Sequence, residues 1–464
     1  MDLALNQLKQ SIFKQDFFSL AGNRKTIVLY NPLSGKGHFD SWCALFTRSL
    51  VVKGWSVCVL TPDASRILSE LQDLSEERRQ QVLILDPQTC LPLSPLAQYL
   101  TKNKLSLNLQ HYLVTTLRNR TDVRRGFVDR LHRMVCRKLH GFFLRKLNPS
   151  FKVSPHSPID FYDDIQLVRQ LMSSQPQIIL NMYLDIYSNV QTDWEPFYRK
   201  VDWHWTGIHI DINNTLPAIY KSKLKGLKSI FYINEDLDLS KLKQIGHIDH
   251  HWLPDVASTA LPDQPTPLTL KATSLAKGRK IIFLGGAIGG TKNIAAWCAV
   301  IRLLDPREWF FIQAGVVDRT TLSINDLTAL QDIESNPPEN LLTFDHYLKN
   351  DSEFNELISI SDLIWGIYRD FDRSSNILGK SAMFHKPILV SNKFLMGQRV
   401  KEYGIGLAVD ENSAKQIAES IAFLISHPVD SKHFDRYSLE HGPEALSDKL
   451  DQSLTKYCQT EKLD

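Results

Sequence analysis

Short apolar runs alternate with segments of helical length along this chain, and this alternation constrains the fold more than any other feature. In the first half, helical patterns at 40–52 and 65–81 separate runs that are apolar enough to be buried strands. These runs lie at 25–30, 55–60, 82–86, 177–183 and 206–210. Strands that alternate with helices typically form a parallel sheet covered on both faces, so we expect a doubly wound α/β domain.

The same alternation starts again after residue 278. Strand-like runs lie at 280–284, 309–313, 362–367 and 387–390, and helical patterns lie at 293–304, 353–360, 376–384 and 414–425. Residues 254–278 carry four prolines and little periodicity, which is typical of a linker. We therefore expect two Rossmann-like domains, 1–253 and 279–430, with a ligand cleft between the carboxyl ends of their sheets. Residues 431–464 are expected to form a helical tail that packs back on the N-terminal domain.

Composition excludes several classes of protein. The 464 residues are 43% apolar and 23% charged, with a net charge of +3, so neither disorder nor nucleic-acid binding is indicated. The six cysteines include no Cys-x-x-Cys pair, which argues against disulfides and thiolate metal sites. The N-terminal residues are too polar for a signal peptide, and no apolar run approaches the ~20 residues of a membrane span. We expect a cytoplasmic protein.

One local charge cluster stands out, within an insertion at 113–147 of the first domain. Between Arg118 and Lys146 there are ten Lys or Arg and two Asp, a net charge of +8. Apolar residues recur there at helical spacing, which predicts a basic amphipathic helix suited to an anionic membrane surface. The alternative is a helix that packs on the first domain with its charges in solvent. No recognised nucleic-acid-reading module accompanies the cluster, so we expect no nucleic-acid partner.

Two patterns in the second half point to anion binding. After the expected strand at 280–284 comes a glycine-rich turn with Gly285, Gly286, Gly289 and Gly290, followed by Lys292. Backbone N–H groups of such a turn approach a diphosphate closely, and the lysine neutralises its charge. The alternative is that the glycines serve only tight turns and packing.

The second pattern is the start of the helix expected near Asn376. Ser374 and Ser375 are good N-cap residues, and the free N–H groups of a first helical turn bind anions. An ordinary capped helix is the alternative. Two anion sites at corresponding ends of one sheet favour the functional interpretation.

The order and spacing of these motifs resemble the donor half of GT-B glycosyltransferases of the family 4 type. The resemblance covers roughly residues 278–425 and includes the stretch from Arg373 to Ile388, the sequence Val-Lys-Glu-Tyr-Gly-Ile-Gly at 400–406, and Asp410. It implies a nucleotide-sugar donor on the second domain and an acceptor on the first. It also implies a retaining reaction without a required metal or cofactor.

The sequence departs from this family at two positions. The family usually has two glutamates eight positions apart, the first near the donor sugar and the second on the ribose; here they are Asp372 and Lys380. At this spacing both side chains would face one side of a helix. An ammonium only donates hydrogen bonds, so we expect Lys380 to contact phosphate or to pair with Asp370 or Asp372. Gly286 stands where the family often has an arginine, and Arg373 is the candidate substitute.

Candidates in the first domain come from its expected strand ends. His204 lies between two tryptophans and is our catalytic candidate beside Asp372; a packed core histidine is the alternative. Asn181, in the run at 177–183, and Asp185, just after it, are further candidates for the cleft. The turn after the first strand supplies the acceptor-side candidates Gly35, Lys36 and Gly37. That turn also looks like the opening of a lipid kinase domain, but the phosphate loop Gly-Gly-Asp-Gly is absent.

No metal site is expected. The Asp-x-Asp pairs at 236–238 and 370–372 occur by chance in most chains of this length, and adjacent histidines rarely converge on one ion. The histidine-rich stretch, which comprises His247, Asp249, His250 and His251, is expected to be a solvated loop.

Taken together, the sequence predicts transfer of a sugar from a nucleotide-sugar to a glycan or lipid-linked acceptor. A catalytically silent GT-B-like protein that binds a glycan, nucleotide or partner is the alternative.

Overall fold

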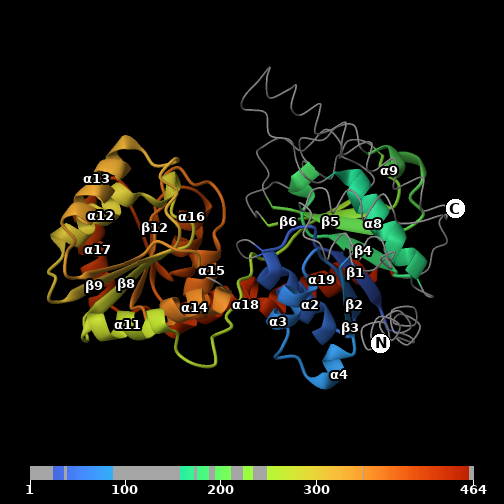
Figure 1. Cartoon of the computed structure of the whole chain (residues 1–464), viewed down its shortest axis with the longest axis horizontal. Coiled ribbons are helices and arrows are strands. Elements are labelled where there is room, and N and C mark those ends of the chain that lie inside the picture. Colours follow the sequence, from blue (N-terminus) through green and yellow to red (C-terminus); the bar gives the residue numbers. More distant parts are fainter. Residues whose placement is uncertain are drawn as a thin grey trace, which may run out of the picture.

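The computed structural model describes residues 24–35, 39–86, 157–171, 175–187, 194–210, 223–233, 248–348 and 350–458. Within these ranges the chain forms two α/β domains that lie side by side (Figure 1). The basic cluster between Arg118 and Lys146, with the whole insertion at 113–147, lies outside the described residues, as do Lys36 and Gly37.

The described part of the N-terminal domain holds a seven-stranded parallel sheet in the order β3-β2-β1-β4-β5-β6-β7. Its strands are β1 (Thr26–Tyr30), β2 (Ser56–Leu60), β3 (Val82–Leu85), β4 (Ile178–Asn181), β5 (Trp205–His209), β6 (Leu227–Tyr232) and β7 (Asp249–Trp252). All five residues of β1 are buried, as the run of apolar and β-branched side chains predicts for a central parallel strand.

Helices cover both faces of this sheet. They are α2 (Phe39–Val52), α3 (Ala64–Glu70), α4 (Glu76–Arg79), α8 (Pro158–Leu171) and α9 (Glu195–Arg199), with a 3₁₀ turn, η1 (Leu184–Tyr187). An apolar core lies on each face of the sheet: one core contains Trp55 and the other contains Trp205. The single helix expected at 65–81 is wrong: the structure has the two short helices α3 and α4, because Asp63 and Ser75 each cap a separate start.

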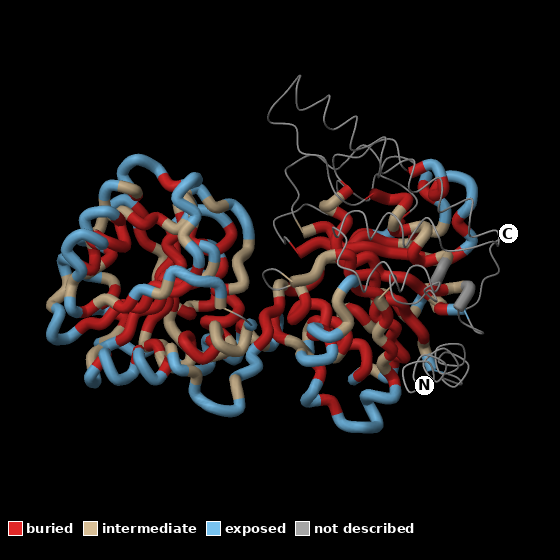
Figure 2. The backbone as a smooth tube through the Cα atoms, in the orientation of Figure 1, coloured by how far each residue is buried: buried red, intermediate tan, exposed pale blue. Residues whose placement is uncertain are grey.

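The C-terminal domain holds a six-stranded parallel sheet, counted over the described residues, in the order β10-β9-β8-β11-β12-β13. Its strands are β8 (Lys280–Gly285), β9 (Trp309–Ala314), β10 (Leu341–Phe344), β11 (Leu363–Gly366), β12 (Ile388–Ser391) and β13 (Gly406–Val409). Figure 2 shows both sheets as the buried centres of their domains. The expected doubly wound architecture is confirmed in both halves.

The helices of this domain again lie on two faces. They are α11 (Pro267–Ala276), α12 (Ile294–Leu303), α13 (Ile324–Ser335), α14 (Asp351–Ser359), α15 (Asn376–Met383), α16 (Phe394–Tyr403) and α17 (Ala414–Ser426), with a 3₁₀ turn, η3 (Gly290–Lys292). The expectation that all of 254–278 is linker is wrong in its second part, where Thr266 caps α11 and Ala272 is fully buried in the domain core. Only 254–265 connects the domains as irregular chain.

Of the last two described helices, the first stays on the C-terminal domain and only the second returns to the N-terminal domain. Helix α18 (Ser431–His441) packs on α15 and α16, and α19 (Pro443–Thr455) packs along α2; in Figure 1 α18 lies between the domains and α19 lies beside α2 in the N-terminal domain. Leu446, Leu450 and Leu454 of α19 are fully buried in the core that also contains Trp55. The N-terminal domain is therefore completed by the last described helix of the chain.

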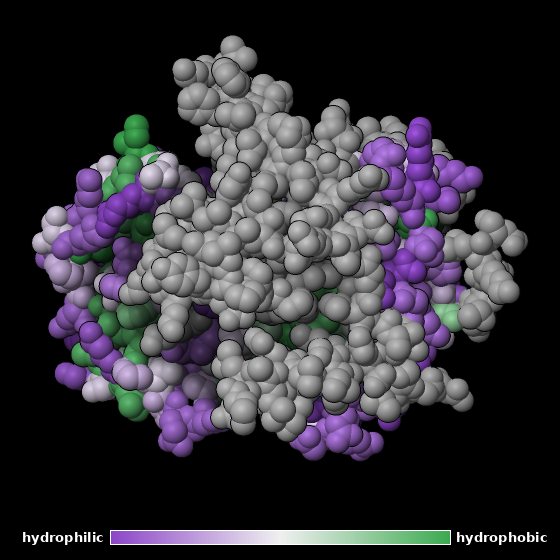
Figure 3. All heavy atoms as spheres, turned by 45° about the vertical axis from the view of Figure 1, so that its right-hand side comes forward, coloured by the Kyte–Doolittle hydropathy of each residue, from purple (hydrophilic) through white to green (hydrophobic). Residues whose placement is uncertain are grey.

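The outer surface is mixed in polarity. In Figure 3 the described surface of the C-terminal domain carries mostly hydrophilic side chains with smaller hydrophobic areas between them. None of the described helices combines the length and the apolar character needed to cross a membrane.

Candidate functional site

The strand orders place the ligand-binding edges of both sheets. In each sheet the order reverses at one point, between β1 and β4 in the first and between β8 and β11 in the second. In open parallel sheets ligands bind outside the carboxyl ends of the strands at such a switch point. Every donor-site residue predicted from the sequence except Lys380 lies either between the last residue of β8 and the end of η3 or between β11 and the first residue of α15.

The glycines after β8 are explained largely by packing. A Cβ at Gly285 would overlap the rings of Phe283 and Phe354, and a Cβ at Gly290 would lie 2.3 Å from the backbone oxygen of Thr321. Gly289 is similarly close to the Thr321 side chain. Gly286 differs, because it has a φ of +92° and a Cβ there would make only an ordinary contact, 4.0 Å from the ring of Phe354. Close packing accounts for three of these glycines, and an unusual backbone conformation accounts for Gly286.

Lys292 lies where the two loops meet. Its Nζ donates a hydrogen bond to the hydroxyl of Tyr368, at 2.5 Å, and lies 3.9 Å from the centre of that ring. Nearby, the backbone N–H of Arg369 donates to the carbonyl of Thr291 at 2.7 Å. The structure thus brings the glycine-rich turn and the loop after β11 together at the switch point, with a lysine between them.

A buried ion pair supports this junction. Arg369 donates to Asp326 at 3.0 Å and to the side chain of Asn293 at 2.7 Å. Burial opposes ionisation of Asp326, but the hydrogen bonds from Arg369 and Ser323 outweigh it, and the pKa of this carboxyl lies below its usual value. Asn293 has a positive φ and bonds the backbone of Glu411, which fixes the residue directly after Lys292.

The start of α15 differs in detail from its prediction. The helix begins at Asn376 with Ser375 as N-cap, but the Ser375 side chain makes no capping hydrogen bond. Ser374 instead accepts a hydrogen bond from the buried guanidinium of Arg399 at 3.0 Å. Arg373 and Asp372 are both exposed and lie 3.7 Å apart as an ion pair.

The prediction for Lys380 is wrong. Because α15 begins only at Asn376, Asp372 is not on the helix and shares no helical face with Lys380. The lysine is buried, and its Nζ donates to the carbonyl of Ser258 at 3.1 Å and lies 3.6 Å from a carboxylate oxygen of Asp351. Burial lowers its pKa, against the opposing effect of Asp351. It pairs with neither Asp370 nor Asp372 and points into the protein.

In the N-terminal domain, side-chain and backbone hydrogen bonds hold the first residues of the loop after β1. The carboxylate of Asp40 accepts hydrogen bonds from the Ser34 hydroxyl, at 2.6 Å, and from the Gly35 backbone N–H, at 2.9 Å. Gly35 has a φ of +83°, which favours glycine. The first acceptor-side candidate therefore lies in a turn tied to the start of α2.

His204 is not at the predicted edge. It precedes β5, so it lies at the amino end of the sheet, opposite the ligand-binding edge, and its Nδ1 is 3.4 Å from the carbonyl of Tyr457. This corrects the catalytic assignment of His204. The residue packs against the C-terminal segment instead.

A histidine that the sequence analysis missed lies at the correct end of the same strand. His209 is the last residue of β5, is buried, and has its Nδ1 2.9 Å from a carboxylate oxygen of Asp185. Asp185 also accepts a hydrogen bond from the backbone of Ile210. Asn181 is occupied locally, bonding the Tyr183 backbone and the Tyr187 hydroxyl. The signal for His209 was present, since it stands at the carboxyl end of the expected strand at 206–210.

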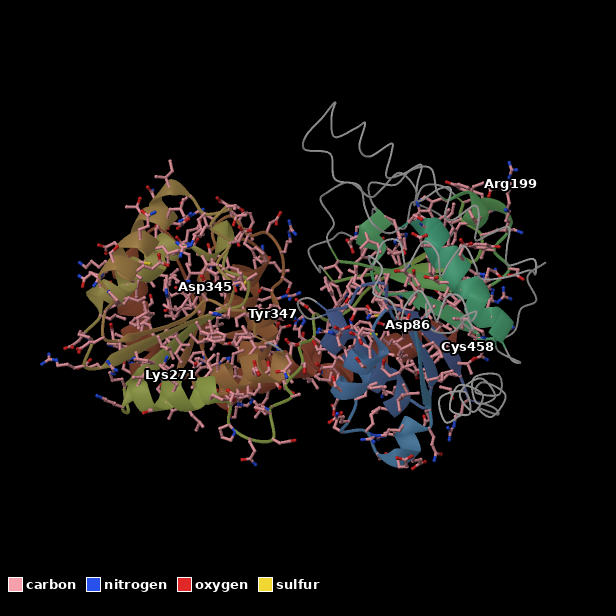
Figure 4. All side chains as sticks on the ribbon, in the orientation of Figure 1. Asp86, Arg199, Lys271, Asp345, Tyr347 and Cys458 are labelled. Carbon is pink, nitrogen blue, oxygen red and sulfur yellow. The ribbon has the colours of Figure 1, made fainter. Side chains whose placement is uncertain are left out.

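Further polar residues follow the other strands at this edge. Asp345 comes directly after β10 and accepts a hydrogen bond from the backbone N–H of Val317 at 2.8 Å. Figure 4 shows Tyr347, two residues on, at the side of the C-terminal domain toward the N-terminal domain. Within the described ranges, no three His, Cys, Asp or Glu side chains gather closely enough to hold a metal ion.

Comparison with known proteins identifies the fold. No protein-family model matches the chain, and no curated protein matches it. Among solved structures it is similar to Anabaena Alr3699/HepE in complex with UDP and glucose, with a TM-score of 0.54 and 9% identity over 93% of this chain and 100% of that one. It is also similar to sucrose-phosphate synthase from Thermosynechococcus elongatus, with a TM-score of 0.52 and 11% identity over 93% of this chain and 99% of that one. The two Rossmann-like domains are those of the GT-B fold.

Proposed function

We propose that this protein is a glycosyltransferase that moves a sugar from a nucleotide-sugar donor to a glycan or lipid-linked acceptor. The observation that carries the proposal is the junction of the loops after β8 and β11, where Lys292 lies between the glycine-rich turn and Tyr368. The HepE structures, which hold UDP and UDP-glucose on a similar fold, support the choice of donor class.

The proposed mechanism relies on charge stabilisation at the leaving group. Lys292 and the N–H groups at the start of α15 bind the diphosphate and stabilise the charge that develops on it as the sugar leaves. Tyr368 orients the lysine. These groups supply positive charge themselves, so the proposal requires no metal. The retaining outcome rests on the resemblance to family 4 alone.

Two side chains are proposed for the sugar side of the reaction. Asp372, exposed in the loop before α15, approaches the donor sugar. His209, oriented by Asp185 at the corresponding edge of the first sheet, faces the reacting groups from the N-terminal domain. The turn at Gly35 lies beside the acceptor.

The silent GT-B-like protein stays the second candidate because of Lys380. Its ammonium is buried and engaged within the protein, so the position where the family places its second acid offers no acceptor to a ligand. On this alternative, the protein would bind a glycan, nucleotide or partner without transferring a sugar.

A thermal shift series tests the donor site. UDP-, GDP-, ADP- and CMP-sugars are compared, and we expect one nucleotide to raise the melting temperature, since a ligand at 100 times its dissociation constant stabilises by about 2.7 kcal/mol. Lys292→Ala should remove the shift, whereas Lys401→Ala, an exposed lysine of the same domain, should leave it. A shift without donor turnover across glycan and lipid-linked acceptors would favour the silent protein, and no shift at all would contradict the donor site.

We further propose that the protein works at a membrane surface in the cytoplasm, through the basic cluster between Arg118 and Lys146. The support is the sequence, in which a net charge of +8 accompanies apolar residues at helical spacing. Sedimentation with liposomes tests it: binding should require anionic lipid and should weaken with salt. Equal absence of binding to anionic and neutral liposomes would refute the proposal.

A further inference from the structure

A hydrogen bond joins the two domains next to the candidate site. The hydroxyl of Ser41, in the first turn of α2, donates to a carboxylate oxygen of Asp351 at 2.6 Å. Asp351 is the first residue of α14 in the C-terminal domain. Ser41 is buried and the side chain of Asp351 is only 17% exposed, so solvent competes little for this bond.

The same carboxylate of Asp351 also pairs with the buried ammonium of Lys380. Lys380 Nζ lies 3.6 Å from the Asp351 oxygen that accepts from Ser41, and it donates to Asn355 at 2.5 Å and to the carbonyl of Ser258 at 3.1 Å. Its side chain is 3% exposed. A buried ammonium is costly unless it is paired and hydrogen-bonded, so the position of Asp351 depends on that of Lys380, and the reverse.

This network also holds the interdomain connection. Asn355 donates to the carbonyls of Ser258 and Ala260, both at 2.9 Å, and these residues belong to the irregular chain at 254–265. Gly379, next to Lys380 on α15, packs against the backbone of Asp255, where a Cβ would lie 3.3 Å from its oxygen. One face of α15 is therefore fixed to the connection between the domains.

The other end of the network reaches the loop after β1. Asp40, the neighbour of Ser41 on α2, holds Ser34 and Gly35 through its carboxylate. Contacts thus run from the turn on the first domain, through the start of α2 and Asp351, to the helix whose N-terminus belongs to the proposed donor site. Glu70 of α3 is close by: burial and the charges of Asp351 and Asp40 raise its pKa.

We propose that Lys380 is a positioning residue that acts through Asp351 and Ser41 to hold α15 and the loop after β1 at a fixed separation. The proposal rests on the glycosyltransferase function, because that separation sets the distance between donor and acceptor. In such a reaction a misplacement of about 1 Å is costly in rate. Lys380 itself contacts neither substrate.

The experiment measures the distance between the domains directly. Spin labels carried on genetically encoded keto amino acids at Val52 and Ile324, both exposed, avoid the native cysteines. We expect Ser41→Ala and Lys380→Met each to broaden the distance distribution. The double variant should broaden it no further, since both changes act through Asp351. Ser352→Ala, whose hydroxyl bonds Asn350 within the same domain, is the matched control.

Kinetics distinguish positioning from ligand contact. With the donor found by thermal shift, Ser41→Ala should lower kcat about tenfold and change the KM for donor less than twofold. Unchanged distance distributions in Ser41→Ala and Lys380→Met would overturn the proposal, as would a loss of donor binding in Lys380→Met without a change in distance. If no nucleotide-sugar binds the unaltered protein, the proposed function fails, and the distance measurement still decides whether Lys380 sets the domain separation.

Discussion

His441 is a buried titratable side chain close to the point where the chain returns to the N-terminal domain. It ends α18, is 3% exposed, and its Nε2 lies 3.0 Å from the Tyr403 hydroxyl. Burial, together with the charges of Arg399 and Lys449, lowers the pKa of its imidazole to about 3. The folded protein therefore holds this histidine neutral at the point where the chain returns to the first domain.

We predict that neutral His441 contributes to the stability of the folded protein and that acid removes this contribution. Its folded-state pKa lies below the unfolded value of 6.5, so the stabilisation is complete above pH 6.5 and is lost as the pH falls toward 3. Each pKa unit is worth about 1.4 kcal/mol, so lowering the pH from 6.5 to 5 should cost roughly 2 kcal/mol. Urea unfolding of the protein and of His441→Gln at the two pH values measures the difference. The exposed His427→Gln should keep the full pH dependence, and an unchanged slope in His441→Gln would contradict the prediction.

At the scale of elements, the sequence predicted β1, which is buried on both faces, but missed β6, which is nearly as buried. The run at 26–30 is continuous and apolar, and β1 was found within one residue. β7 was missed because its sequence, Asp-His-His-Trp, reads as a polar loop, yet it pairs with β6 and buries His250 against Tyr232. The expected solvated loop at this histidine-rich stretch is therefore wrong from Asp249 onward.

The sequence predicted which loops form the candidate site, but it did not predict where the side chains of these loops point. The glycine-rich turn and the start of α15 were located from local sequence, since strand ends and helix starts leave local signals. Lys380 was misplaced because its direction depends on the connection between the domains, which packs against α15 and which local sequence does not place. His204, by contrast, was misassigned although it precedes the expected strand at 206–210, whereas His209 stands at the carboxyl end of that parallel strand.

Gly315 offers a test of the close packing at the β8 loop. It follows β9 with a φ of +136°, and a Cβ there would lie 1.9 Å from the carbonyl oxygen of Gly286. Gly315→Ala should therefore displace the glycine-rich turn, destabilise the protein by about 2–4 kcal/mol and weaken nucleotide binding. Gly278→Ala is the control, because this glycine also has a positive φ but nothing lies within 4 Å of its Cβ position. It should cost only about 1–2 kcal/mol, measured by urea unfolding, and equal costs in the two variants would argue against displacement.

At the scale of the whole molecule, the described part of the chain crosses between the domains twice. The first crossing is the connection at 254–265 and the second is the junction of α18 and α19. Beyond the second crossing, α19 is anchored to the N-terminal domain by ion pairs of Asp451 with Lys25 and of Lys456 with Asp249. The chain therefore joins the domains at two points, and the Ser41–Asp351 hydrogen bond adds a non-covalent link whose network also contacts the first of them.

We predict that α19 contributes substantially to the stability of the N-terminal domain. Leu450 is fully buried against the core of that domain, so Leu450→Ala should cost about 2–5 kcal/mol. Leu439→Ala, on α18, should be close to neutral, since this side chain is 73% exposed. Limited proteolysis locates the effect: Leu450→Ala should expose cleavage sites in the first domain, and new cleavage confined to the second domain would contradict the prediction.

The return of α19 to the first domain has a consequence for synthesis. A ribosome completes the seven strands of the N-terminal sheet when residue 252 has been made, but the helix that covers one face of that sheet ends at Thr455. Roughly 200 residues separate the two events, which is about 10–40 s of translation at typical rates. During that interval the apolar surface that Leu446, Leu450 and Leu454 later cover is exposed on the nascent chain. The domain that emerges first is therefore finished last, and its apolar face waits for α19 until translation nears its end.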